Sequence, residues 1–206
     1  MVDLTPQHVL KPGVAAAPQP GERVNGDVAV VEYVSAGMLI AGVDGAGHGP
    51  EAHRAARAAT HAIRRSRQED LTVLMAACHE ALRGTRGAAV TLALLSVGPP
   101  MLTWLGVGTV EGRLLNARRW PPEPRASLRL SSGTLGHDLP AVMPASAPLQ
   151  HGDLVVLATD GVRSGFGDAL DPHGSSQQVA ERILSDHSRG TDDALVVVVR
   201  YVEARR

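Results

Sequence analysis

Aspartates stand at the borders of several apolar stretches in this 206-residue chain. Asp44 and Asp160 each end such a stretch, and a glycine follows each of them directly. Asp192 and Asp193 open a third stretch, and Asp27 opens a fourth. Clustered carboxylates repel one another unless a cation neutralises them, and oxygen ligands with water suit Mg²⁺ or Mn²⁺ rather than zinc. Two such ions roughly 4 Å apart would activate a water molecule for in-line attack on a phosphate.

A glycine-rich loop follows Asp44. Gly45, Gly47 and Gly49 alternate with other residues, so the backbone of this loop can approach a ligand closely. Pro50 then predicts the first turn of a helix. A carboxylate between a strand end, such a loop and a helix N-terminus suits a divalent cation or a phosphate. Taken alone, the pattern fits an ordinary tight turn better, and the aspartates further along the chain are what favour a metal site.

Apolar periodicity predicts the elements that position these aspartates. Helices are expected at three- and four-residue spacing over 50–67, 71–82 and 177–184, the last with Ser175 or Ser176 as its cap. Strands are expected over 27–34, 38–43, 88–97, 101–107, 112–116, 128–130, 154–158 and 194–201. The first two of these strands should form a hairpin around Ala36 and Gly37.

The remaining segments are expected to connect these elements. Residues 1–20 contain four prolines and an alanine run, and predict a loose lead-in with a short strand at 8–10 at most. Residues 118–127 predict a surface connection, and residues 131–146 a loop rich in glycine and proline. The element order does not alternate strand and helix, so it indicates an α+β fold of packed antiparallel sheets covered by helices. Because neighbouring antiparallel strands bring the end of one beside the start of the next, the carboxylates should meet at a single sheet edge.

Composition excludes several classes of function. The chain is long enough for one domain with a substantial core, and 44% of its residues are apolar. An aromatic content of 2% and a net charge of −1 argue against a nucleic acid partner. The single cysteine, Cys78, excludes an internal disulfide and a cysteine-rich zinc site. No apolar run is long enough to span a membrane and no signal peptide is seen, so we expect a cytoplasmic protein without a membrane partner.

Three familiar motif classes do not fit the chain. The loop around Gly49 lacks the Gly-Lys-Ser/Thr of a phosphate-binding P-loop. It also lacks the Gly-x-Gly-x-x-Gly of a dinucleotide-binding fold, and the chain does not alternate strand and helix. The segment Gly161-Val-Arg-Ser-Gly165 has the wrong spacing for the nucleophile of a serine hydrolase.

Four segments follow one another along the chain: 44–52, 86–91, 152–162 and 192–200. Together they resemble the metal-dependent protein serine/threonine phosphatases, the protein phosphatase 2C-like or PPM family, and within it the bacterial SpoIIE/RsbX branch. Residues 104–112 and 135–140 are similar to the short, single-domain RsbX type. The resemblance covers nearly the whole chain. It implies a single phosphatase domain over 1–206 with a four-layer α-β-β-α sandwich of two antiparallel sheets flanked by helices.

The resemblance implies a role for each matching residue. Asp44 would bridge two Mn²⁺ or Mg²⁺ ions, and the carbonyl group of Gly45 would bind one of them. Asp160 and Asp192 would hold the other ion, which makes the three aspartates the catalytic set. Asp193 would be a neighbour of the site rather than a ligand. We find no counterpart of the aspartate that binds a third metal in some relatives.

Three further residues are candidates near the site. Asp27 resembles the acidic residue of the first family motif, which reaches water held by the metals. Arg23 lies near the position of the phosphate-binding arginine of eukaryotic relatives, although the spacing differs by one residue. His48 could donate a proton to the leaving group, or it could simply hold the loop, and the second role is favoured.

The RsbX-like branch implies a specific substrate class. Its members remove phosphate from Ser or Thr of STAS-domain proteins in a stressosome-like complex, which controls a stress-response sigma factor through partner switching. The alternative is a catalytically weak, phosphatase-like module that binds phosphoprotein partners without turnover. Intact Asp44, Asp160 and Asp192 argue against that alternative, because a protein without turnover has no need for clustered carboxylates.

Overall fold

Two five-stranded antiparallel sheets face each other in the computed structural model, which describes residues 9–66, 69–118, 120–168 and 170–202. In one sheet the strands follow the order β1 (Leu10–Ala17), β10 (Ala194–Tyr201), β9 (Asp153–Ala158), β6 (Glu111–Asn116) and β7 (Glu123–Ser127). In the other the order is β2 (Asp27–Tyr33), β3 (Gly37–Gly45), β4 (Ala88–Val97), β5 (Pro100–Val107) and β8 (Ala145–Pro148).

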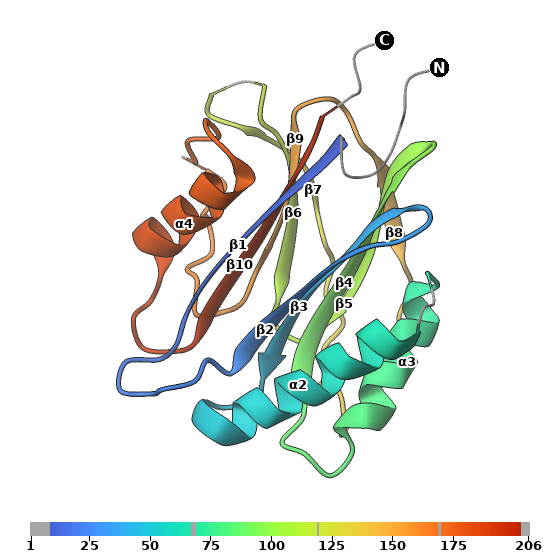
Figure 1. Cartoon of the computed structure of the whole chain (residues 1–206), viewed down its shortest axis with the longest axis vertical. Coiled ribbons are helices and arrows are strands. Elements are labelled where there is room, and N and C mark those ends of the chain that lie inside the picture. Colours follow the sequence, from blue (N-terminus) through green and yellow to red (C-terminus); the bar gives the residue numbers. More distant parts are fainter. Residues whose placement is uncertain (1–8, 67–68, 119, 169, 203–206) are drawn as a thin grey trace.

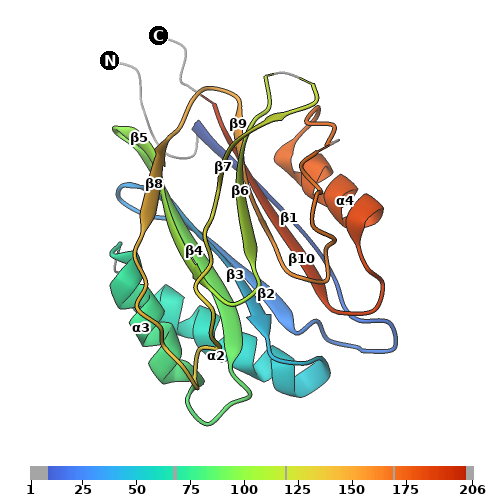
Figure 2. The same cartoon turned by 180° about the vertical axis from the view of Figure 1, so that it is seen from behind.

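Helices cover the outer faces of this sandwich. Helices α2 (Gly49–Ser66) and α3 (Leu71–Leu82) lie on the sheet of β2 and β3, and α4 (Ser176–His187) lies on the sheet of β1 and β10 (Figure 1). The view from behind shows the same four layers (Figure 2). The predicted four-layer α-β-β-α sandwich is therefore confirmed. None of the described helices combines the length and apolar character that crossing a membrane would require.

The central strands carry apolar residues on both faces because each face is buried against a different layer. In β9, Val155 and Leu157 pack between the two sheets, whereas Val156 and Ala158 pack under α4. Helix α2 is rich in alanine on its buried face, which brings its backbone close to β2 and β3. This explains why the strand patterns are continuous rather than alternating: alternation requires one face in solvent.

The first twenty residues differ from the predicted loose lead-in. Residues 10–17 form β1, an eight-residue strand paired along its whole length with β10. The predicted strand at 8–10 overlaps β1 only at Leu10, and His8 lies outside the described residues. The outer edge of β1 is covered by α4: the side-chain amide of Gln177 accepts from the N–H of Val14 at 2.9 Å and donates to its carbonyl at 2.8 Å. Pro12 is tolerated because β1 is an edge strand.

Two short strands also lie outside the predicted positions. The strand expected at 128–130 occurs instead at β7, within the segment predicted as a surface connection. Strand β8 pairs with β5 and covers the end of the predicted loop at 131–146 and the residues directly after it. Both strands are largely exposed at sheet edges and are short, so their sequences carry little apolar periodicity.

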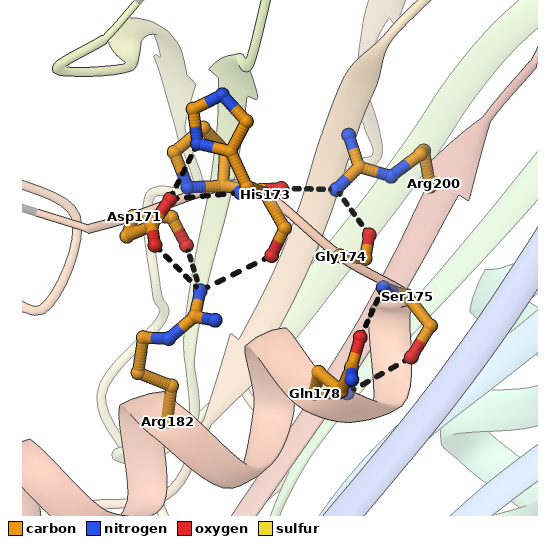
Figure 3. Close-up of polar contacts among 8 residues, drawn as sticks. Asp171, His173, Gly174, Ser175, Gln178, Arg182 and Arg200 are labelled. Carbon is orange, nitrogen blue, oxygen red and sulfur yellow. Dashed lines mark hydrogen bonds and ion pairs between the residues drawn. The ribbon is translucent and has the colours of Figure 1, made fainter.

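Helix α4 begins at the cap that the sequence predicted. The Ser175 side chain accepts from the N–H of Gln178 at 3.2 Å, and the Gln178 side chain accepts from the N–H of Ser175 at 2.9 Å. The loop before this cap is tied down by Asp171 and Arg182, whose side chains lie 3.4 Å apart (Figure 3). Arg200 of β10 donates to carbonyl groups in the same loop.

Candidate metal centre

The carboxylates meet at one end of the sandwich, where β3 and β9 end and β10 begins. Asp44 lies at the end of β3, in the sheet that faces α2. Asp160 follows β9 and Asp192 precedes β10, so both belong to the other sheet. The predicted meeting point at a single sheet edge is therefore wrong. Antiparallel pairing brings Asp27 opposite Asp44, but the approach of Asp160 and Asp192 depends on packing between the two sheets.

One open pocket of about 220 Å³ is lined by Asp44, Asp160 and Asp192. The remaining lining residues come from three turns: Ala46 and Gly47 after β3, Gly108 and Thr109 after β5, and Gly133 and Thr134 of the 131–146 segment, together with Ala89 of β4. A cavity of this size is smaller than the roughly 300–1,000 Å³ typical for drug-sized ligands. It is suited to ions and a small anionic group.

Two glycines allow the strands to converge on the pocket. A Cβ atom at Gly45 would lie 2.1 Å from the carbonyl oxygen of Ala52, in the first turns of α2. A Cβ atom at Gly161 would lie 1.9 Å from the carbonyl oxygen of Asp193. No other residue permits such close approach. The glycine after each of the two strand-end aspartates therefore lets the next element pack directly against the turn.

Asp44 is held in an orientation that faces the pocket. Its Oδ2 accepts a hydrogen bond of 3.0 Å from the hydroxyl of Thr109. Burial, followed by the negative charge of Asp160, raises the pKa of Asp44 to about 7. A carboxylate with such a pKa lacks a compensating positive charge from the protein, which is what a cation would supply.

Asp27 and Asp193 lie buried behind the pocket. Burial, followed by the charge of Asp44, raises the pKa of Asp27 to about 8. The Oδ1 atom of Asp193 accepts from the N–H of Gln19 at 2.8 Å. One oxygen of each carboxylate, Oδ2, is buried and has no hydrogen-bond partner among the described residues. Unpaired buried oxygens are unfavourable in a protein without a bound cation or water.

Asp160 and Asp192 complete the cluster from the opposite sheet. Burial and then the neighbouring charge of Asp192 raise the pKa of Asp160, and Arg189 acts in the opposite direction. Arg189 also donates from Nε to the carbonyl of Asp160 at 2.7 Å, which fixes the turn. The Oδ1 atom of Asp192 accepts from the N–H of Asp193 at 2.9 Å. Of the two consecutive aspartates, Asp192 lines the pocket and Asp193 does not.

The two candidate phosphate-binding residues lie away from the pocket lining. Arg23 is exposed in the segment before β2. The Nδ1 atom of His48 lies 2.7 Å from Oε1 of Glu22, so the imidazole is turned towards the turn before β2. This pairing agrees with a role in holding the loop.

The donor set fits Mg²⁺ or Mn²⁺. All candidate ligands are oxygens, three carboxylates face one pocket, and burial followed by neighbouring carboxylates raises the pKa values of Asp44 and Asp160. In the described part of the chain, no three acidic, histidine or cysteine side chains form a ready-made cage around one point. A cage is not required, because Mg²⁺ is usually held by one or two carboxylates and keeps several waters.

Three pocket residues were not identified from the sequence. Thr109 donates a hydrogen bond to Asp44, Thr134 lines the pocket, and Arg189 lies beside Asp160. The only local sequence signal was a glycine next to each of them, at positions 108, 133 and 190. A glycine indicates a turn but does not identify a hydrogen-bond partner. Their proximity to the aspartates arises from contacts between turns far apart in the sequence.

A model of the Stage II sporulation protein E (SpoIIE) family matches residues 35–202. A search of curated proteins gives no match. Among solved structures, one described as "The bacterial stressosome: a modular system that has been adapted to control secondary messenger signaling" is 28% identical, with a TM-score of 0.83 over 93% of this chain and 99% of that chain.

Two more solved structures share the fold at lower identity. RsbX in complex with magnesium is 18% identical, with a TM-score of 0.82 over 94% of this chain and 96% of that chain. The catalytic domain of the serine/threonine phosphatase PstP in complex with two manganese ions is 19% identical, with a TM-score of 0.70 over 95% and 99%. With the family match covering most of its length, the chain belongs to the SpoIIE family of PPM-type protein serine/threonine phosphatases.

Proposed function

We propose that this protein is a metal-dependent phosphatase that hydrolyses phosphoserine or phosphothreonine on STAS-domain regulators of a partner-switching pathway in the cytoplasm. The observation that carries the proposal is the pocket shared by Asp44, Asp160 and Asp192. These carboxylates come from both sheets, and burial and mutual repulsion raise the pKa values of Asp44 and Asp160. Such an arrangement is unfavourable in an isolated fold and becomes favourable when divalent cations bind.

The residues divide between two Mn²⁺ or Mg²⁺ ions. Asp44 would bridge the ions, with the Gly45 carbonyl on one of them and Asp160 and Asp192 on the other. When bound, such ions polarise a phosphate and lower the pKa of a water. Thr109 keeps one oxygen of Asp44 oriented by its hydrogen bond.

Other groups of the chain prepare the site around these ligands. Arg189 fixes the backbone of Asp160 and partly offsets its charge. The buried Oδ2 atoms of Asp27 and Asp193 lie behind the pocket, where each can accept a hydrogen bond from a water molecule.

A phosphorylated side chain of a protein is the substrate class that best fits the pocket. Its volume of about 220 Å³ admits a phosphate and little more, so specificity must come from the surface around it. The family match and the resemblance of the chain to the RsbX type support STAS-domain regulators as the phosphoproteins. The fold neighbours related to the stressosome and to RsbX are consistent with that choice.

Phosphate release in the presence and absence of metal tests the proposal. We expect Mn²⁺ or Mg²⁺ to raise the melting temperature and to support hydrolysis of p-nitrophenyl phosphate and of a phosphorylated STAS-domain protein. Excess EDTA should abolish both reactions. Full activity in EDTA would contradict the two-metal mechanism. Turnover of p-nitrophenyl phosphate without turnover of any phosphorylated STAS-domain protein would contradict the substrate class alone.

The same assay separates the enzyme from a module that only binds phosphoproteins. A binding module would retain a phosphorylated partner without releasing phosphate at any metal concentration. The raised pKa values of Asp44 and Asp27 favour turnover, because repelling carboxylates serve no purpose in a surface that only binds an anion.

A further inference from the structure

We propose that Arg86 is the side chain that receives the phosphate group of the substrate at the carboxylate pocket. The inference rests on the proposed phosphatase function and assigns a phosphate-binding role that the sequence placed on Arg23 or His48. Arg86 lies in the turn between α3 and β4, about forty residues along the chain from the loop that it faces. Its place follows from the tertiary contacts of that turn.

The turn that carries Arg86 is fixed on two sides. The carbonyl of Gly87 accepts from the N–H of Ala46 at 3.0 Å, which ties the turn to the glycine loop after Asp44. On the other side, Nε2 of His137 lies 3.2 Å from the carbonyl oxygen of Arg86, and Ala88 pairs with Leu135. Both flanking segments also contribute residues to the pocket lining, so the turn lies next to the pocket.

The guanidinium group of Arg86 lies over the pocket-lining glycine at position 47. A Cβ atom built on Gly47 would be 3.1 Å from Nη1 of Arg86. Gly47 lines the pocket together with Asp44. The charged end of Arg86 therefore lies beside the wall of the pocket, while the side chain remains exposed and free to follow a ligand.

Arg86 also lacks the partner that other arginines have. In the described ranges, no Asp or Glu forms an ion pair with Arg86, whereas several other arginines do, among them Arg54, Arg64, Arg83, Arg113, Arg125 and Arg182. Arg189, another cation near the cluster, donates from Nε to the carbonyl group of Asp160. Arg86 is thus a guanidinium beside the pocket that has no ion-pair partner among the described residues and can bind an anion.

The chemistry of the pocket calls for such a group. Three carboxylates repel a phosphate dianion, and the two proposed metal ions offset their charge without leaving much excess. A guanidinium can donate two parallel hydrogen bonds to phosphate oxygens, and its planar geometry matches them. Placed beside the pocket, it would hold the phosphate by oxygens that the metals do not bind.

The test compares Arg86→Ala and Arg86→Lys with Arg83→Ala. Arg83 is an exposed arginine three residues away whose partner is Glu80, so its removal controls for charge and for disturbance of the turn. The measurements are kcat and KM for p-nitrophenyl phosphate with Mn²⁺, the affinity of the Mn²⁺-loaded protein for inorganic phosphate by calorimetry, and the affinity of the metal-free protein for Mn²⁺.

We expect Arg86→Ala to weaken inorganic phosphate binding and to raise KM by roughly ten- to a hundredfold, as removal of a charged hydrogen-bond donor does. Arg86→Lys should be intermediate, because an ammonium group keeps the charge and loses the paired geometry. Mn²⁺ affinity should stay unchanged in all variants, and Arg83→Ala should match the wild type throughout.

The inference and the proposed function fail in different ways. Phosphate affinity within twofold of the wild type in Arg86→Ala would overturn the role of Arg86 while leaving the phosphatase intact. An equal loss in Arg83→Ala would reduce the effect to general surface charge and would also overturn it. Absence of turnover in the wild type would overturn the proposed function, and the phosphate titration would still decide whether Arg86 binds the anion.

Discussion

Two groups of charged side chains in this protein shift the pKa of an aspartate in opposite directions. Before α4, Asp171 accepts from the N–H of His173 at 3.0 Å, from its ring nitrogen at 2.6 Å, and lies 3.4 Å from Arg182 (Figure 3). These contacts, the backbone hydrogen bond first, hold the pKa of Asp171 below its usual range. At the other site, burial and repulsion raise the pKa of Asp44 to about 7.

The difference shows how the same residue type serves structure or chemistry. The protein supplies several donors to Asp171, so this carboxylate anchors a loop. Asp44 receives one hydroxyl from Thr109 and faces several other carboxylates. A site prepared for a metal is thus recognised by charges that the fold leaves uncompensated.

The largest expected effect separates the two groups by activity. Asp44→Asn and Asp160→Asn each keep the shape of the side chain and remove a charge proposed to hold metal, so kcat/KM with Mn²⁺ should fall at least about a hundredfold. Asp171→Asn should stay within about twofold of the wild type, because its role is to anchor the loop. Steady-state hydrolysis of p-nitrophenyl phosphate measures all three. Wild-type turnover in Asp160→Asn would show that the site is misplaced.

A smaller effect distinguishes consecutive aspartates at the start of β10. Asp192 lines the pocket, whereas Asp193 is buried and accepts from the N–H of Gln19. Asp192→Asn should lower Mn²⁺ affinity by more than about tenfold, and Asp193→Asn should keep it within about tenfold, as expected for a residue that supports a ligand. Calorimetric titration of Mn²⁺ into both metal-free variants is the direct measurement. The reverse order would move the metal ligand to Asp193.

The pH dependence of stability sharpens the comparison without catalysis. The pKa values of Asp27 and Asp44 are raised to about 8 and about 7, so the metal-free fold prefers both groups protonated. Their stabilising contribution is complete below the unfolded pKa near 4 and is lost as pH rises through about 7 to 8. The melting temperature in EDTA should therefore fall from pH 5 to pH 9.

Asp44→Asn provides the matched variant for this measurement. The melting temperature of this variant in EDTA should fall less over the same pH range than that of the wild type. At pH 8 the metal-free variant should melt on the order of a few degrees above the wild type. Bound Mn²⁺ should remove the pH dependence in the wild type above pH 7. A metal-free wild type that gains stability from pH 5 to pH 9 would contradict the repulsion.

The smallest expected effect concerns the capping box at the start of α4, which follows the loop that Asp171 anchors. Ser175→Ala removes one half of the capping box before α4 and should destabilise the fold by about 1 kcal/mol, or roughly 2–4 °C in melting temperature. Mn²⁺ affinity and kcat should not change. Thermal unfolding with and without Mn²⁺ measures this variant, and a loss of metal affinity would show that the two regions are coupled.

Most of the fold could be predicted from the chain because its signals are local. Apolar runs and helical periodicity marked β2 to β6, β9, β10 and the described helices α2, α3 and α4, and glycine marked the turns after Asp44 and Asp160. Strand β1 was not found as a full strand, because its alanines and Pro12 resemble a linker until β10 and Gln177 pair with it. Strand β7 was missed because an exposed edge strand carries little apolar pattern.

The sequence by itself determined which residues could hold a metal, because aspartates next to glycine at strand ends can be identified from the local pattern. Only the tertiary structure decided how they meet, since Asp44 and Asp160 belong to different sheets and their approach follows from the packing of two apolar faces. It also decided the neighbours of the pocket, Thr109, Arg189 and Arg86. Such neighbours lie close in space because separate turns close over the same end of the sandwich, and no periodicity along the chain records that contact.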